Sequence, residues 1–387
     1  MKQTSPHIGI MIAPPSLSIA AASLKFGNNL PPCFRIHKSH LTTSRNKRNI
    51  PQQMNSPTLF SLKSADLPNR HQIDHPLIAR SAHNPIITAA HLPFPGQCCF
   101  NSGAVRVGKE IVMVLNCWDA EWIPHFLIAR SRDGIHFDID AKTIASPPDE
   151  YPYIGRKDGI FDTRITSLDG FHYITYNVSS ALGGRIRLLR TADFESFDDL
   201  GFITSIDHRN CVIFPKKFNG LYARLERPNG EGSTGGDIYL SYSPDLIFWG
   251  KTQLLLQKST RYWESYKIGP GAPPVRTDAG WLVFYHGCRQ HMNGIMYNAG
   301  VMLLDLNAPS KVVGKMRACL MWPEEEYEFR GNVPQVVFPT AAVTGNHADE
   351  LFVYYGAADS SICLATVSIS ALVERCLADG PCLPGQS

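Results

Sequence analysis

The sequence predicts an all-β fold, a five-bladed β-propeller that follows a disordered or loosely attached N-terminal extension. From about residue 76, short apolar and aromatic runs recur roughly every ten residues, separated by Gly, Asn, Asp and Pro. Short runs rich in Val, Ile, Tyr and Phe predict strands, and helical periodicity is scarce over the same region. A turn motif also repeats at the spacing expected of propeller blades.

The strand-like runs are spread over the whole body of the chain. The clearest of them cover residues 111–115, 171–177, 238–243, 281–286 and 351–355. Their length is that of single strands rather than of helices, so the body is expected to be nearly all β.

The turn motif has the form Ser/Thr-x-Asp-x-x-x-aromatic and follows a strand-like run each time. Its three copies are Ser131-Asp133-Phe137, Thr191-Asp193-Phe197 and Ser243-Asp245-Trp249. The Asp can close a tight turn by accepting backbone N–H bonds, while the aromatic ring packs back under the turn. A unit of 50 to 60 residues is typical of a four-stranded blade, and residues 76–387 have room for five. A pair of β-sandwiches is the competing architecture.

Residues 1–75 have a different composition, rich in Ser, Pro, Asn and basic residues and without a sustained period. The segment is expected to be disordered, and three origins stay open for it. Its lack of acidic residues up to Ala65 resembles an organellar transit peptide, and the apolar stretch over residues 8–24 resembles a secretory signal. Translation that begins near Met54 would make the segment an artefact of the assigned start.

Composition and charge exclude several classes of protein. The 44% hydrophobic content is ordinary, and no apolar run of eighteen residues is present to span a membrane. Eight of the 37 basic residues fall within the first 65, which leaves 29 against 34 acidic residues, so a nucleic-acid-binding body is not expected. The ten cysteines are scattered, without zinc or redox spacing, and predict buried thiols in the reducing cytoplasm. Homo-oligomer formation stays open.

One acidic position stands out in the segment Phe161-Asp162-Thr163-Arg164, between a glycine turn at Gly159 and a strand expected from Ile165. A carboxyl at the entrance of a strand beside a guanidinium can act as a general acid, although Asp–Arg neighbours also form structural ion pairs. Asp359 is a second candidate, on a small-residue loop where it can bind sugar hydroxyls or cap a turn.

Four basic residues lie beside Gly, Pro or Asn, where a rigid backbone can aim a side chain: Arg209, Arg227, Lys267 and His286. Each alone has the composition of a solvated surface residue. If they converge, they form a pocket for a dianion with several oxygens. No P-loop, G-x-S-x-G, H-E-x-x-H or dinucleotide motif is present, so no metal or cofactor is expected.

From about residue 84 to residue 366 the sequence resembles glycoside hydrolase family 130, the β-mannoside phosphorylases. The resemblance depends on an ordered series of motifs, not on any single one. They include Phe100-Asn101-Ser102-Gly103, Asp162-x-Arg164-Ile165-Thr166, Ser243-Pro244-Asp245-Leu246, Lys267-Ile268-Gly269-Pro270-Gly271, Tyr285-His286-Gly287, Tyr297-Asn298-Ala299-Gly300, Gly331-Asn332-Val333-Pro334 and residues 354–359.

The resemblance implies a five-bladed propeller that splits a β-1,4-mannoside with inorganic phosphate as co-substrate, giving α-mannose 1-phosphate and an acceptor sugar. Asp162 matches the single general acid, which in the family is thought to act through the 3-hydroxyl of the mannosyl unit. The phosphate-binding positions match Arg209, Arg227, Lys267, His286 and Ser102. The substrate-binding positions match Asn101, Arg164 and Asp359.

The chain departs from the family around the acid, where Phe161 and Thr163 replace a common Glu and Pro. This leaves the acceptor sugar open among glucose, mannose and N-acetylglucosamine. Two alternatives also stay open: a hydrolase of the same family, in which the basic phosphate positions are replaced, and a sugar-binding propeller that has lost catalysis.

Overall fold

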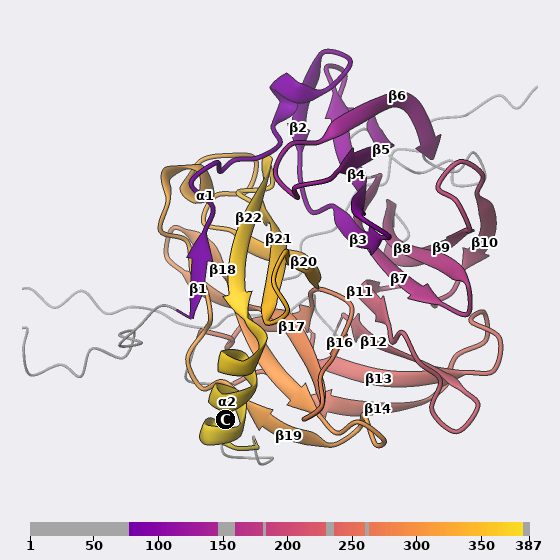
Figure 1. The fold of residues 1–387 in the computed structure, drawn as a ribbon, viewed down its shortest axis with the longest axis vertical. Helices are drawn as coiled ribbons and strands as arrows, with labels where there is room; N and C mark the ends of the chain where they lie inside the picture. The colour runs from indigo at the N-terminus through magenta and orange to yellow at the C-terminus, as the bar shows by residue number, and fades with distance from the viewer. Residues whose placement is uncertain (1–76, 146–158, 181–182, 230–235, 260–262, 382–387) are drawn as a thin grey trace, which may run out of the picture. The chain divides into compact units, whose positions relative to one another are not determined.

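A computed structural model of the protein describes residues 77–145, 159–180, 183–229, 236–259 and 263–381. Its strands form five antiparallel sheets arranged as the blades of a β-propeller, which confirms the predicted fold (Figure 1). The interpretations of residues 1–75 concern a segment that lies outside the described residues.

Each blade has an inner strand near the axis and successive strands outward. Blade 1 contains β2 (Gly96–Cys99), β3 (Gly103–Val107), β4 (Glu110–Asp119), β5 (Pro124–Ser131) and β6 (Asp138–Ala145). Blade 2 contains β7 (Ile160–Leu168), β8 (Phe171–Ser180), β9 (Gly183–Thr191) and β10 (Asp198–Phe202). Blade 3 contains β11 (His208–Ile213), β12 (Tyr222–Pro228), β13 (Ile238–Ser243) and β14 (Gly250–Leu256). Blade 4 contains β15 (Lys267–Pro270), β16 (Val275–Arg276), β17 (Trp281–His291), β18 (Gly294–Leu304) and β19 (Val312–Lys315).

Blade 5 closes the ring with strands from both ends of the body. It consists of β20 (Val337–Thr344), β21 (Glu350–Ala357), β22 (Ser361–Ser368) and β1 (Ile78–Arg80), which pairs with β22. Arg80 fixes this junction, since its guanidinium lies 2.8 Å from the buried Glu328 carboxylate and 2.6 Å from Glu324. Pairing of the first strand with the last blade covers a strand edge that would otherwise be open to other chains.

The predicted turn motif joins the last two strands of blades 1, 2 and 3. The Oδ1 atoms of Asp133, Asp193 and Asp245 each accept backbone N–H bonds of 2.8–3.0 Å from the residues two and three positions on. Asp305 forms the same turn in blade 4. This fourth copy lacks the aromatic residue, and the sequence motif therefore does not match it.

Three short helices were not predicted: η1 (Ala89–His91), α1 (Glu326–Phe329) and α2 (Ile369–Asp379). In α2 the side chain of Ser368 caps the first turn, and Leu372 and Cys376 pack into a core shared by blades 4 and 5. The apolar spacing of Ile369, Leu372, Val373, Cys376 and Leu377 is that of an amphipathic helix, a signal that was overlooked in the sequence. No helix in the described part of the chain is long and apolar enough to cross a membrane. All eight cysteines that the structure describes are buried and outside disulfides.

Candidate active site

The site is built on irregularities of the inner strands at the propeller axis. Asn101 lies between β2 and β3 with φ of 47°, Asp162 in β7 with φ of 60°, and Asn210 in β11 with φ of 52°. The pairing register of β7 and of β11 shifts across these residues. A bulge of this kind re-aims one side chain, and Asn and Asp tolerate the left-handed conformation better than other residues with a Cβ. Asp162 therefore lies within a strand, not at the strand entrance that the sequence predicted.

Three amide groups hold the carboxylate of Asp162. Asn101 Nδ2 donates to Oδ1 at 2.9 Å, while Asn177 Nδ2 and Asn210 Nδ2 donate to Oδ2 at 2.8 and 3.3 Å. Asn177 also accepts a 3.1 Å hydrogen bond from the backbone N–H of Asn210, so the amides of Asn177 and Asn210 are themselves connected. Asn177 and Asn210 were not predicted as site residues. Asn177 lies inside β8 and is buried, and a buried amide needs partners.

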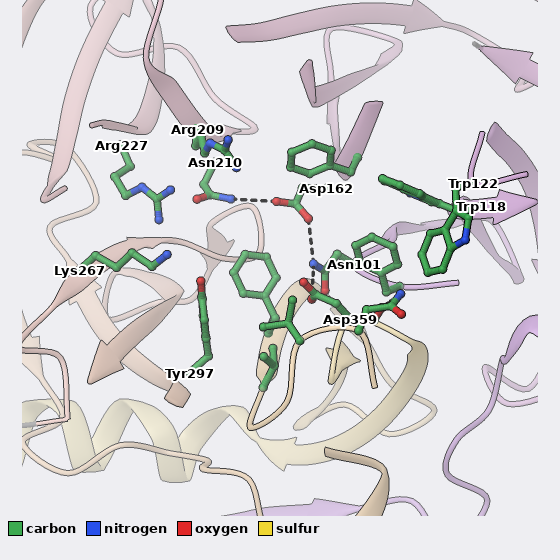
Figure 2. Close-up of a pocket in the computed structure, with 16 residues that line it drawn as sticks. Asn101, Trp118, Trp122, Asp162, Arg209, Asn210, Arg227, Lys267, Tyr297 and Asp359 are labelled. Atoms are coloured by element: carbon green, nitrogen blue, oxygen red, sulfur yellow. Dashed lines mark hydrogen bonds between the residues drawn. The ribbon is translucent and has the colours of Figure 1, made fainter. Parts of the chain in front are cut away.

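Asp359 lies next to Asp162, on the turn between β21 and β22. The Nδ2 atom of Asn101 donates to both carboxyl groups, at 2.9 Å to Asp162 and 3.1 Å to Asp359 (Figure 2). Desolvation in the pocket and the negative charge of Asp162 raise the pKa of Asp359 to about 7. The pair thus combines a carboxylate that accepts three amide bonds with a carboxyl that keeps a proton near neutral pH.

Three cations line the same cavity as the two acids. They are Arg209 and Arg227 from blade 3 and Lys267 from blade 4. Burial and the neighbouring charges of Arg227 and Arg209 lower the pKa of Lys267 to about 8. Its ammonium lies 4.8 Å from the centre of the Tyr297 ring. Like charges gathered in a partly desolvated pocket are costly without a counter-ion, which is the arrangement expected of an anion site.

His286 lies behind this cation group rather than in the cavity. It is fully buried, and its Nε2 accepts a hydrogen bond of 3.1 Å from Nη1 of Arg227. Burial and the positive charges of Arg227 and Lys267 hold the pKa of His286 well below its ordinary value. The imidazole therefore acts as a neutral acceptor that supports Arg227, and its predicted contact with phosphate stays a prediction.

Ser102 and Arg164 also lie outside the cavity lining. The hydroxyl of Ser102 accepts from the backbone N–H of Asn116 at 2.9 Å, and the side chain is buried between strands. The guanidinium of Arg164 donates to the carbonyls of Gly271 and Thr163 and stacks 5.3 Å from the Phe338 ring centre. In this structure both residues brace the inner strands, and their predicted contacts with phosphate and sugar stay predictions.

The cavity has a volume of about 320 Å³, which is the scale of a small sugar with an anion. Its sixteen lining residues include the two acids, the three cations and Tyr297. An aromatic wall is formed by Phe100, Trp118 and Trp122. Figure 2 shows Arg209, Arg227 and Lys267 on one side of Asp162, with Trp118 and Trp122 on the other. Among the described residues, no three His, Cys, Asp or Glu side chains are grouped so that they could hold a metal ion.

Carboxyl groups that can bind sugar hydroxyls and cations that can bind an anion share this cavity, which defines a propeller protein with a site suited to a carbohydrate and an anion. Comparison with known proteins gives the particular family. A family model described as beta-1,4-mannooligosaccharide phosphorylase matches residues 76–377, and the chain belongs to this family, glycoside hydrolase family 130 of mannoside phosphorylases.

Individual relatives differ in the linkage named for them. The chain is 31% identical to a beta-1,4-mannooligosaccharide phosphorylase of Ruminococcus albus, over 81% of this chain and 96% of that protein. It is 33% identical to a beta-1,2-mannobiose phosphorylase of Listeria innocua, over 65% of this chain and 69% of that protein. A solved structure of beta-1,2-mannobiose phosphorylase from Listeria innocua with beta-1,2-mannobiose has a TM-score of 0.70 at 27% identity, covering 78% of this chain and 99% of the other.

Proposed function

We propose that this protein cleaves β-1,4-mannosides with inorganic phosphate and inversion of configuration, releasing α-mannose 1-phosphate and an acceptor sugar. The observation that carries the proposal is the position of Arg209, Arg227 and Lys267 in the same cavity as Asp162 and Asp359. Phosphate is already an anionic nucleophile that needs to be held rather than deprotonated, and three cations beside the acids are suited to hold it.

The cations are suited to hold the phosphate. Two guanidinium groups offer planar forks of N–H donors, and the Lys267 ammonium adds a point charge. An oxygen of phosphate then forms the bond to the anomeric carbon of the mannosyl unit as the bond to the acceptor oxygen breaks. The same cations offset the repulsion between the dianion and the acids beside it.

Asp162 supplies the proton that the departing acceptor oxygen takes up, through the 3-hydroxyl of the mannosyl unit as in the family. The amides of Asn101, Asn177 and Asn210 fix the orientation of the acid. Asp359 and Asn101 are placed beside it to bind mannosyl hydroxyls.

The β-1,4 linkage is the finer part of the proposal. It is supported by the description of the family model and by the Ruminococcus albus relative, whose similarity covers 81% of this chain against 65% for the β-1,2 relative. Both linkages therefore belong in the test.

The test incubates the protein with phosphate and β-1,4-mannobiose, β-1,2-mannobiose or 4-O-β-mannosyl-glucose, and follows products by phosphorus and proton NMR. We expect α-mannose 1-phosphate from the β-1,4 substrates only. Free mannose released equally without phosphate would replace the proposal by hydrolysis. Product from the β-1,2 substrate alone would overturn the linkage. Sugar binding without any turnover would indicate a binding protein.

A further inference from the structure

The aromatic wall of the cavity has no role in holding phosphate or the acid. Phe100, Trp118 and Trp122 line it, with Trp118 and Trp122 packed edge to face at a centroid distance of 6.0 Å. Trp118 is only 9% exposed, while Trp122 is 41% exposed, which is unusual for so large an apolar ring. Trp122 therefore keeps much of its surface free to contact a ligand.

The backbone holds Trp122 in a costly conformation. Its φ is 64°, which is an outlier for a bulky residue. The carboxylate of Asp119 fixes the turn by accepting N–H bonds from Glu121 at 3.0 Å and Ile123 at 2.9 Å. His125 binds the other oxygen of Asp119 at 2.9 Å. Strain of this kind persists where the surroundings over-determine it, and it presents the indole without a further ordering cost on binding.

Trp118 adds an independent sign of a missing ligand. Its indole Nε1 is buried and has no hydrogen-bond partner among the described residues. Buried donors are nearly always paired, with protein, water or ligand. A hydroxyl-bearing ligand against this wall can satisfy the donor.

The position of the wall identifies the part of the substrate that meets it. In an inverting displacement the nucleophile and the leaving group lie on opposite sides of the anomeric carbon. The cations lie on one side of Asp162 and the two tryptophans on the other (Figure 2). We infer that Trp122, backed by Trp118, is the platform on which the acceptor sugar stacks, an inference that rests on the proposed phosphorolysis.

The chemistry of the ring restricts the acceptor. An indole face packs against the C–H face of a pyranose, so hexoses whose ring substituents are mainly equatorial fit best. Glucose, N-acetylglucosamine and a 4-linked mannose each offer a face of this kind. The platform thus selects a pyranose shape while the cations select the nucleophile.

The experiment compares Trp122→Ala and Trp122→Phe with the wild type in the synthetic direction, from α-mannose 1-phosphate and an acceptor. We expect Trp122→Ala to raise the KM for the acceptor about tenfold, with the KM for α-mannose 1-phosphate within about twofold, and Trp122→Phe to restore most of the loss. Phe248→Ala is the matched control, because Phe248 is 75% exposed and lines no part of this cavity. An unchanged acceptor KM in Trp122→Ala would overturn the inference.

A second measurement separates this inference from the proposed reaction. Titration with free glucose and cellobiose, followed by calorimetry, reports binding without turnover and does not depend on the fluorescence of Trp122. We expect the response to be lost in Trp122→Ala and kept in Phe248→Ala. A wild type that forms no α-mannose 1-phosphate but shows this pattern would refute the phosphorolysis and leave the platform standing. A response that survives in Trp122→Ala would refute the platform alone.

Discussion

Replacement of Asp359 by asparagine tests the electrostatics of the carboxyl pair without an assay of activity. Desolvation and the charge of Asp162 raise the pKa of Asp359 from 3.8 to about 7. The folded protein therefore keeps a proton that the unfolded chain releases between about pH 4 and 7. Stability falls over that interval as pH rises, because the unfolded state alone gains from ionisation. The amide in the Asp359→Asn variant has no such proton to release, so the variant escapes this loss.

The size of the effect follows from linkage. A pKa unit is worth about 1.4 kcal/mol, so the full shift corresponds to roughly 4 kcal/mol. At pH 5 the unfolded carboxyl is already ionised, so part of this loss of stability is present there. The remaining loss of about 2–3 kcal/mol develops between pH 5 and pH 8. Solvent reaches this half-buried side chain, so we expect Asp359→Asn to gain about 1–2 kcal/mol over the wild type between pH 5 and pH 8.

Urea unfolding at pH 5 and at pH 8, followed by tryptophan fluorescence, measures how the stability difference between the variant and the wild type changes with pH. Any effect of the asparagine substitution on stability that does not depend on pH cancels, because only the change with pH is compared. Asp140→Asn, on the exposed face of β6, serves as control and should give parallel curves at both pH values. If Asp359→Asn also gave the same stability difference at pH 5 and pH 8, the folded carboxyl would be ionised throughout and the reasoning would be refuted.

Three further predictions concern the reaction. Asp162→Asn should abolish phosphorolysis and synthesis while calorimetry still detects phosphate binding; full activity would remove Asp162 as the acid. Lys267→Ala should raise the KM for phosphate at least tenfold, and because the pKa of Lys267 is about 8, wild-type phosphate affinity should fall as pH rises through 8. A phosphate affinity that stays constant from pH 7 to 9, once corrected for the fraction of phosphate dianion, would contradict this. His286→Ala should raise the phosphate KM severalfold through Arg227, and its pH profile between 5 and 7 should match the wild type; a lost titration there would show a charged His286.

Much of the fold could be predicted because its signals are local. A turn closed by Asp133 is specified within a few residues, and the same is true of the turns at Asp193 and Asp245. Closure of the ring could not be predicted in this way. The three residues of β1 pair with β22, roughly 290 positions further along, and nothing in so short a segment indicates its partner.

The site was predicted in part, through the resemblance to a family rather than through spacing. Asn101, Asp162, Arg209, Arg227, Lys267 and Asp359 line one cavity, whereas Ser102, Arg164 and His286 lie outside its lining. The reason is the direction of side chains. Asn101 and Ser102 lie between β2 and β3, where the left-handed backbone of Asn101 turns its side chain toward Asp162 while Ser102 bonds to Asn116. A bulge between Phe161 and Arg164 breaks the alternation that would place Arg164 beside Asp162.

The left-handed backbone conformation at three positions also explains which residue types the site can use. The left-handed positions at Asn101, Asp162 and Asn210 favour Asn and Asp, and these are also the side chains that build the network around the acid. Conformation and chemistry thus select the same residues. Gly356 on the neighbouring blade adds a steric constraint, because a Cβ there would collide with Oδ1 of Asn101. Any side chain at Gly356 would displace the amide that joins Asp162 to Asp359, so this glycine is required by the site as much as the acids are.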